Sequence, residues 1–144
     1  MPKTPALKRV MTPFPYSIQI DAPIADARRL MEEHRIRHLP VKDGDQLTGI
    51  LTDRDIKLVL GPYMDIPSIH PVLVRHACLT EIFTAEIDTP LDLVVEEMAR
   101  RRVGSVIVTK DARLAGIFTS VDLCRVTAAL LRGTPDEISG GDAA

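Results

Sequence analysis

One heptapeptide occurs twice in the chain, as GILTDRD at residues 49–55 and as GIFTSVD at residues 116–122. An offset of 67 residues relates the two copies, which share glycine, isoleucine, threonine and aspartate at equal positions. The similarity extends outward at the same offset, because ten of 36 positions are identical between residues 21–56 and 88–123. Such self-similarity is the signature of a fold assembled from copies of one supersecondary unit. The sequence therefore predicts two related units.

Each copy has the pattern of a β-α-β-β-α unit. It opens with a short stretch of alternating, β-branched residues that predicts a strand, at residues 16–20 and 83–87. A helix is expected next in each copy, with Pro23 and Pro90 in its first turn and Thr89 as an N-cap. Two further strands are expected at residues 36–41 and 47–51, and at 103–108 and 114–118, with a second helix after Thr52 and after Thr119.

A single unit of this size buries too little surface to be stable alone, so we expect the two copies to form one α/β (α+β) core. The predicted division is an N-terminal arm at residues 1–10, a first repeat at 11–61, a linker at 62–77, a second repeat at 78–131 and a flexible tail at 132–144. Three prolines forbid a continuous helix in the linker, and both ends have few apolar side chains to bury.

Composition argues against two classes of partner. The 144 residues carry 18 Lys and Arg against 20 Asp and Glu, a net charge of −2, and only 3% are aromatic. Neither nucleic acid nor an anionic membrane surface is therefore expected as a partner. No apolar run is long enough to span a bilayer, and the first residues lack a signal-peptide core. Cys78 and Cys124 form no CxxC pair. We expect a cytoplasmic protein.

The repeated Thr-x-x-Asp has two interpretations. As a capping box it does no more than start a helix, because the threonine accepts an N–H of the first turn and the carboxylate reaches back. As a ligand site it presents a carboxylate that can accept two hydrogen bonds, which suits the 2′,3′-diol of a ribose but repels a phosphate. The preceding glycine would then allow the ligand to approach the backbone closely.

Taken together, these features resemble the cystathionine-β-synthase (CBS) domain family. The resemblance covers residues 11–60 and 78–127 and rests on Met11-Thr12, Asp21-x-Pro23, IRHLPV at residues 36–41, Gly49-x-x-Thr52-x-x-Asp55 and the tandem copy. It implies two repeats packed through their sheets with pseudo-twofold symmetry, a Bateman module. It also implies that two modules associate as a homodimer.

The resemblance further implies a regulatory function without catalysis. Family members bind adenosine-containing ligands such as AMP, ADP, ATP, S-adenosylmethionine or NAD in the clefts between repeats, and regulate an attached or partner protein. No cofactor is required beyond such a ligand, and the effector protein stays unidentified. The alternative is a dimerisation or docking module that binds no ligand.

The family's binding residues can be carried over position by position. In the first copy they are Ser17, Ile18, Ile36, Arg37, His38, Pro40, Thr52, Arg54 and Asp55; in the second they are Thr84, Ala85, Val103, Ser105, Ile107, Thr119 and Asp122. The aspartates would bind the ribose hydroxyls. The threonines would lie at the edge of the ribose or the phosphate, and the first strand of each unit would border the base. The second copy departs further from the family pattern, with Gly104-Ser105 in place of Arg37-His38. We expect the first copy to be the better site.

Other chemistry is not supported by the pattern. His34 and His38 lie four residues apart with no carboxylate or cysteine to complete a metal site. The segment His76-Ala77-Cys78 resembles a Cys/His pair, but an inert buried cysteine explains it much better. No activated nucleophile or general base is evident, so we expect neither a metal site nor an enzyme.

Overall fold

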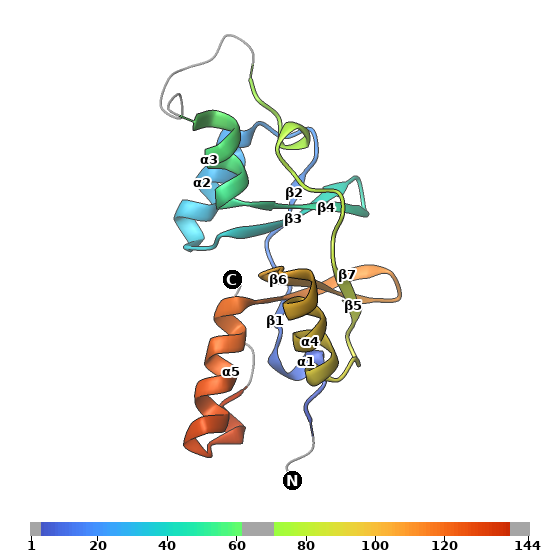
Figure 1. Ribbon diagram of the computed structural model, residues 1–144. Helices are drawn as coiled ribbons and strands as arrows, with labels where there is room; N and C mark the ends of the chain where they lie inside the picture. Colours follow the sequence, from blue (N-terminus) through green and yellow to red (C-terminus); the bar gives the residue numbers. More distant parts are fainter. Residues whose placement is uncertain (1–3, 62–70, 139–144) are drawn as a thin grey trace. The chain divides into compact units, whose positions relative to one another are not determined.

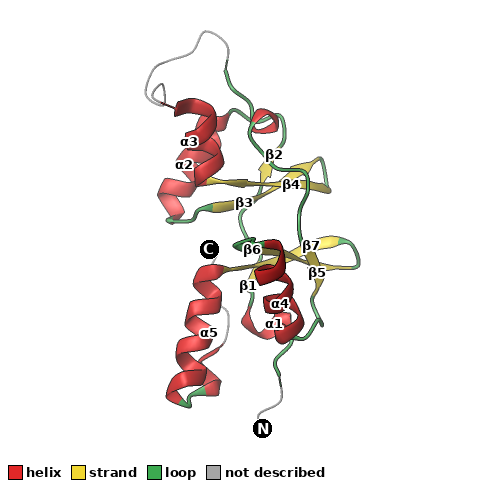
Figure 2. Ribbon diagram, viewed as in Figure 1, coloured by secondary structure: helices red, strands yellow, loops and turns green. Residues whose placement is uncertain are grey.

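The protein is described by a computed structural model that covers residues 4–61 and 71–138 (Figures 1 and 2). The chain divides into two compact units. The first-repeat unit is Tyr16–Ile82, and the second-repeat unit combines Met1–Pro15 with Phe83–Ala144. Among the described residues no helix combines the length and the apolar composition needed to cross a membrane.

The first-repeat unit has a three-stranded sheet in the order β2-β3-β4, with β2 parallel and β4 antiparallel to β3. Its elements are β2 (Ile18–Gln19), α2 (Ile24–His34), β3 (His38–Asp43), β4 (Gln46–Thr52), α3 (Asp53–Leu60) and the 3₁₀ turn η2 (Val74–His76). The helices α2 and α3 pack together on one side of this sheet (Figure 2). The fully buried side chains between these helices and the sheet are those of Leu39, Val41, Leu51 and Ile56.

The second-repeat unit has a four-stranded sheet in the order β1-β7-β6-β5. Its elements are α1 (Leu7–Val10), β1 (Thr12–Pro13), β5 (Thr84–Glu86), α4 (Leu91–Arg101), β6 (Ser105–Lys110), β7 (Arg113–Thr119), α5 (Ser120–Arg132) and the 3₁₀ turn η3 (Pro135–Ile138). The extra strand β1 comes from the N-terminal part of the chain and pairs antiparallel with β7. Phe118 and Val106 are fully buried at the centre of the core.

The predicted repeat is confirmed in three dimensions. His38 lies opposite Thr52 in the first sheet, and Ser105 lies opposite Thr119 in the second, at the same offset of 67 residues. Both hairpins also shift register at the same place, after Val41 in the first and after Val108 in the second. The predicted β-α-β-β-α order and the α/β class are therefore correct in both copies.

The helix starts differ from the expectation. Pro23 and Pro90 are themselves the N-cap residues, with extended backbones, and Thr89 lies one position before the cap. The first free N–H of each helix is satisfied by a distant carbonyl, since Ile24 donates to Val72 and Leu91 donates to Pro5. A threonine cap was unnecessary because tertiary backbone contacts supply the acceptors.

The expectation that residues 133–144 have almost nothing to bury is wrong for the described part of that segment, and the N-terminal segment also packs on the core. Leu7 and Val10 of α1 are completely buried in the second-repeat core, and Ile138 of η3 is 3% exposed there. The described end of the predicted linker likewise packs on the first-repeat core through Val74 and Ala77. Each segment contributes only one or two apolar side chains, too few for a periodic signal. Residues 1–3, 62–70 and 139–144 lie outside the described residues.

The motif glycines are explained by close backbone packing. A Cβ at Gly49 would lie 2.6 Å from the carbonyl oxygen of Leu79, which is paired with Ile50 by two hydrogen bonds of 2.9 Å. A Cβ at Gly116 would lie 2.5 Å from Met11 Sδ and 2.8 Å from the carbonyl oxygen of Thr12. The glycines therefore admit another segment of the chain, which corrects the expectation that they admit a ligand.

Replacing Gly49 by alanine should lower the free energy of unfolding by about 1–3 kcal/mol, the usual cost of forcing an extra methyl into a packed site. The atom in the way belongs to backbone that is fixed by two hydrogen bonds. Gly104→Ala is the control, because its Cβ would meet only the Ser120 hydroxyl, at 3.2 Å. Urea unfolding compares the two variants, and an equal loss in both would contradict the explanation.

Candidate functional site

The first copy of the motif forms a complete capping box at the start of α3. The Asp55 N–H donates to Thr52 Oγ1 at 3.1 Å, and Asp55 Oδ2 accepts from the Thr52 N–H at 2.9 Å. The structural interpretation of Thr-x-x-Asp is thus correct for this copy. It uses only one carboxylate oxygen, however. Asp55 Oδ1 accepts no hydrogen bond from any residue that the structure describes, and the side chain is partly exposed.

The surroundings of Asp55 are apolar and open. Leu79, whose backbone pairs with β4 beside the motif, is 54% exposed, and Leu58 of α3 is 72% exposed. The Cys78 thiol is close enough for the charge of Asp55 to raise its pKa, although burial is the larger cause of that increase. Strand pairing also places His38 opposite Thr52. Exposed leucines therefore stand on α3 three residues after the unsatisfied carboxylate and on the segment that pairs with β4.

The second copy has the same backbone but a different carboxylate environment. Asp122 is only 4% exposed. Its Oδ2 accepts from the Thr119 N–H at 2.8 Å and from the Thr119 hydroxyl at 3.2 Å. Its Oδ1 accepts from the Thr12 hydroxyl at 3.3 Å and from Arg125 Nη2 at 3.1 Å. Both oxygens are therefore occupied by protein donors.

A cavity of about 390 Å³ lies in the first-repeat unit, where α2 ends and α3 begins. It is lined by Arg28, Met31, Glu32, Arg35, Ile36, Arg37, Asp53 and Lys57. Two ion pairs balance part of the charge, between Arg28 and Glu32 at 3.3 Å and between Lys57 and Asp53 at 2.8 Å. Arg35 and Arg37 are exposed and leave a surplus of positive charge.

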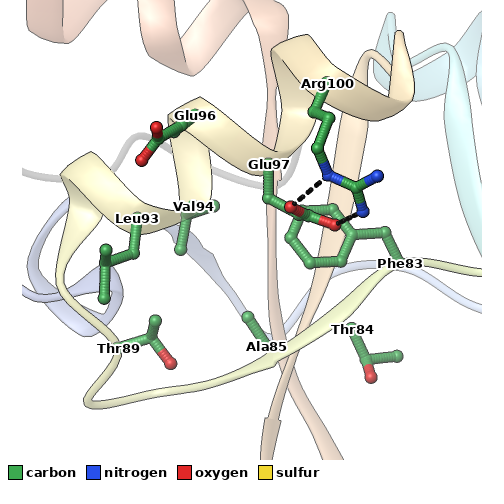
Figure 3. Close-up of a pocket in the computed structure, with 9 residues that line it drawn as sticks. All are labelled: Phe83, Thr84, Ala85, Thr89, Leu93, Val94, Glu96, Glu97 and Arg100. Carbon is green, nitrogen blue, oxygen red and sulfur yellow. Dashed lines mark hydrogen bonds and ion pairs between the residues drawn. The ribbon is translucent and has the colours of Figure 1, made fainter.

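The second-repeat unit has a cavity of about 540 Å³ between β5 and α4 (Figure 3). Its lining residues are Phe83, Thr84, Ala85, Thr89, Leu93, Val94, Glu96, Glu97 and Arg100. Hydrogen bonds from Arg100 and then from Arg101 lower the pKa of Glu97 to about 2, and Arg101 also lies 4.7 Å over the Phe83 ring. Because Arg100 is already paired and Glu96 adds another carboxylate, this cavity has no surplus of positive charge.

The structure separates the predicted binding residues by exposure. The side chains of Ile36, Pro40, Ile107, Thr119 and Asp122 are buried. Those of Arg37, Arg54, Thr84 and Val103 are exposed, and those of Ser17, Ile18, His38, Thr52, Asp55, Ala85 and Ser105 are partly exposed. Thr84 and Ala85 line the second-repeat cavity, whereas Ile36 and Arg37 line the first. Asp55 and Asp122 are not among the lining residues of either.

Two residues that bind the carboxylate of the second motif were missed in the sequence. Arg125 was not singled out, and Thr12 was noted only as part of the resemblance. Extending the comparison beyond the motif at the same offset would have identified both, because leucines stand at the equivalent positions 58 and 79. A polar or charged residue that replaces an apolar one in a repeat is the signal.

A family model for the CBS domain matches residues 7–61 and 74–129. The chain belongs to the CBS domain family. The structure is similar to the CBS domain pair of protein MJ0100 in complex with 5′-methylthioadenosine and S-adenosyl-L-methionine, with a TM-score of 0.78 and 25% identity. That match covers 89% of this chain and 99% of the other.

Two curated relatives are enzymes that contain a similar region. The L-aspartate semialdehyde sulfurtransferase of Methanocaldococcus jannaschii is 30% identical over 122 residues, which are 83% of this chain and 23% of the enzyme. The inosine-5′-monophosphate dehydrogenase of Thermoplasma acidophilum is 31% identical over 109 residues, 75% of this chain and 21% of the enzyme. The CBS domain pair thus spans less than a quarter of either relative.

The two thiols should differ in their reaction with iodoacetamide. The thiolate is the reactive form, and both burial and the charge of Asp55 raise the pKa of Cys78, whereas Cys124 is exposed. Cys124 should therefore be alkylated first at pH 8, as followed by mass spectrometry. Asp55→Asn should accelerate Cys78 because it removes the nearby negative charge. Asp122→Asn is the control and should leave the Cys78 rate unchanged; an equal acceleration would contradict the proximity of Asp55.

Proposed function

We propose that this CBS domain pair is a regulatory module that binds an adenosine-containing ligand at the first copy of its motif. The observation that carries the proposal is the open carboxylate of Asp55, whose Oδ1 lacks a donor while Oδ2 is held by the capping box. A carboxylate oxygen that is oriented in this way can accept hydrogen bonds from the vicinal hydroxyls of a ribose. The capping box supports this function because it fixes the side chain before the ligand arrives.

The surroundings of Asp55 suit the rest of a nucleoside. The chain has few aromatic residues, so a base would lie against aliphatic side chains and backbone. Leu79 supplies an exposed apolar surface next to β4, the strand that leads into the motif. Burying such a leucine against a base is favourable by about 25 cal/mol for each Å² removed from water.

The local positive charge beside the first motif favours a ligand that bears phosphate over one that does not. Arg54 lies inside the motif, and Arg35 and Arg37 line the nearby cavity with its surplus of positive charge. Guanidinium groups bind phosphate oxygens in a bidentate manner. We therefore place the phosphate-bearing ligands AMP, ADP, ATP and NAD ahead of S-adenosylmethionine, although the similar MJ0100 pair was determined with two adenosine compounds that lack phosphate.

Regulation would follow from linkage. A ligand shifts an equilibrium between two arrangements only by its differential affinity for them, and a partner protein that prefers one arrangement senses the change. The activities of the two curated relatives are those of much longer proteins, and we propose no catalysis for this chain. The effector protein would be recognised by its response to the bound ligand.

Thermal unfolding against AMP, ADP, ATP, S-adenosylmethionine and NAD tests the proposal. A ligand at 100 times its dissociation constant should add about 2.7 kcal/mol to the free energy of unfolding. Asp55→Ala should remove the shift, because its carboxylate is the proposed ribose acceptor. Asp43→Ala is the matched control, a carboxylate at the far end of β3. Stabilisation by none of the five ligands would refute the proposal, as would a shift that Asp55→Ala leaves intact.

A second candidate function, self-association, is favoured by one face of α5. Val121, Cys124, Ala128 and Leu131 recur at helical spacing, and Val121 and Leu131 are 75% and 83% exposed. We propose that a second copy of the chain covers this stripe. The stripe is self-complementary. If two α5 helices run antiparallel about a twofold axis level with residue 126, Val121 of one copy faces Leu131 of the other at each end. Cys124 then faces Ala128 in the middle.

Leu131→Glu should weaken this self-association. Burying a leucine is worth about 1.5–3 kcal/mol, so its replacement by a charge should raise the dimer dissociation constant at least about tenfold. Sedimentation over a range of concentrations measures the effect. Leu93→Glu is the control, since Leu93 is 54% exposed on α4 and outside the stripe. A dimer that is weakened equally by both variants, or a wild-type chain that stays monomeric, would contradict the assignment.

A further inference from the structure

We propose that the second motif is structural. Its Asp122 forms a hydrogen-bonded network with Thr12 and Arg125, here called the clasp, and the chain therefore binds one adenosine ligand rather than two. The inference rests on the proposed function for its ligand, but its structural part stands on the contacts of Asp122. That carboxylate binds Thr12 of the N-terminal segment and Arg125 of α5, and it has no capacity left for a ribose. Asp55, its equivalent in the first copy, has that capacity.

Arg125 is the centre of the clasp. Its Nη2 donates to Asp122 Oδ1 at 3.1 Å and to the Val10 carbonyl oxygen at 3.2 Å, while its Nη1 donates to the Ile138 carbonyl oxygen at 3.1 Å. One guanidinium thus connects the end of α1, the first turn of α5 and the end of η3. Val10 and Ile138 are both buried members of the second-repeat core, so the clasp stabilises their positions.

The carboxylate of Asp122 is saturated. Two carboxylate oxygens offer about four lone-pair positions, and four donors already occupy them: the Thr119 N–H, the Thr119 hydroxyl, the Thr12 hydroxyl and Arg125 Nη2. A ribose would have to displace Thr12 or Arg125 from a residue that is 4% exposed. Displacing Arg125 would leave a buried charge without its partner, which is strongly unfavourable.

The first copy lacks both elements of the clasp although its backbone is the same. Thr12 pairs with Ile117, and Leu79 pairs with Ile50 at the equivalent place. A leucine methyl cannot donate to a carboxylate. Position 125 corresponds to Leu58, which is 72% exposed and equally unable to donate. Two side-chain differences therefore leave one motif open and the other closed.

Exposure follows the same division. Thr12 is completely buried beside the closed carboxylate, whereas Leu79 is 54% exposed beside the open one. The protein keeps solvent access at Asp55 and removes it at Asp122. Both aspartates accept from the N–H of the threonine three residues before them, so this part of the cap is common to the two copies. The bonds from Thr12 and Arg125 are found at Asp122 alone.

Unfolding of the ligand-free protein tests the clasp directly. Asp55→Ala and Asp122→Ala both remove a capping carboxylate, so Asp55→Ala serves as the matched control. Asp122→Ala should lower the urea midpoint clearly further, because it also releases Thr12 and leaves Arg125 without its carboxylate. Equal midpoints in the two variants would overturn the structural role.

Transplanting the clasp tests the closed-site prediction. The double variant Leu58→Arg/Leu79→Thr places the two donors next to Asp55, at two positions whose wild-type side chains are exposed. Calorimetric titrations with AMP and, separately, with S-adenosylmethionine should give one site per wild-type chain. The transplanted clasp should weaken that binding at least about tenfold while the protein stays folded, since a tenfold loss corresponds to only about 1.4 kcal/mol. Leu58→Ala/Leu79→Ala is the control, because it removes the same leucines without adding donors.

The outcomes separate the two proposals. Two sites per chain, or unchanged affinity in the transplanted variant relative to the alanine control, would overturn the inference while leaving the proposed function intact. Binding of neither probe would count against the proposed function, and the unfolding comparison of Asp55→Ala with Asp122→Ala would then decide the clasp. One site that survives Asp122→Ala and disappears in the transplanted variant supports both.

Discussion

The close backbone approach at the two motif glycines is the constraint on which the rest of the structure depends. Each glycine lies in a strand whose neighbour is a segment that precedes the other repeat in the sequence: Met11 and Thr12 lie against Gly116, and Leu79 lies against Gly49. A side chain at either glycine would prevent the pairing. This pairing places the N-terminal segment in the second-repeat unit, and it determines which residue lies beside each motif carboxylate.

The pairing places a different residue beside each motif aspartate, and the hydrogen bonding of the two carboxylates differs as a result. Asp122 receives a hydroxyl from Thr12 and becomes part of a buried network with Arg125, whereas Asp55 receives a leucine and keeps an open oxygen. A buried carboxylate needs a cation and hydrogen-bond donors to offset its lost hydration, and a partly exposed one can be completed by a ligand. The repeat thus supplies one anchor and one candidate binding group from the same motif.

Much of the local structure could be predicted because its causes are local. The alternation of apolar residues predicts the strands, the helical spacing predicts α2 to α5, and the Thr-x-x-Asp motif predicts the capping box at Asp55. The prediction failed where distant groups supply the contacts. The Pro5 carbonyl caps the helix that was expected to depend on Thr89, the Val72 carbonyl does the same for α2, and single apolar residues such as Ile138 join the core from segments without periodicity.

The sequence by itself determined that the chain has two copies of one β-α-β-β-α unit, that each copy carries a helix-capping aspartate, and that the family is the CBS domain. Only the tertiary structure decided which aspartate is available. The two donors that close Asp122 Oδ1 come from Thr12, 110 residues away in the chain, and from Arg125 on the same helix. Their equivalents beside Asp55 are leucines. Hydrogen bonds over such separations depend on how the strands pair, and a one-dimensional pattern does not contain that pairing.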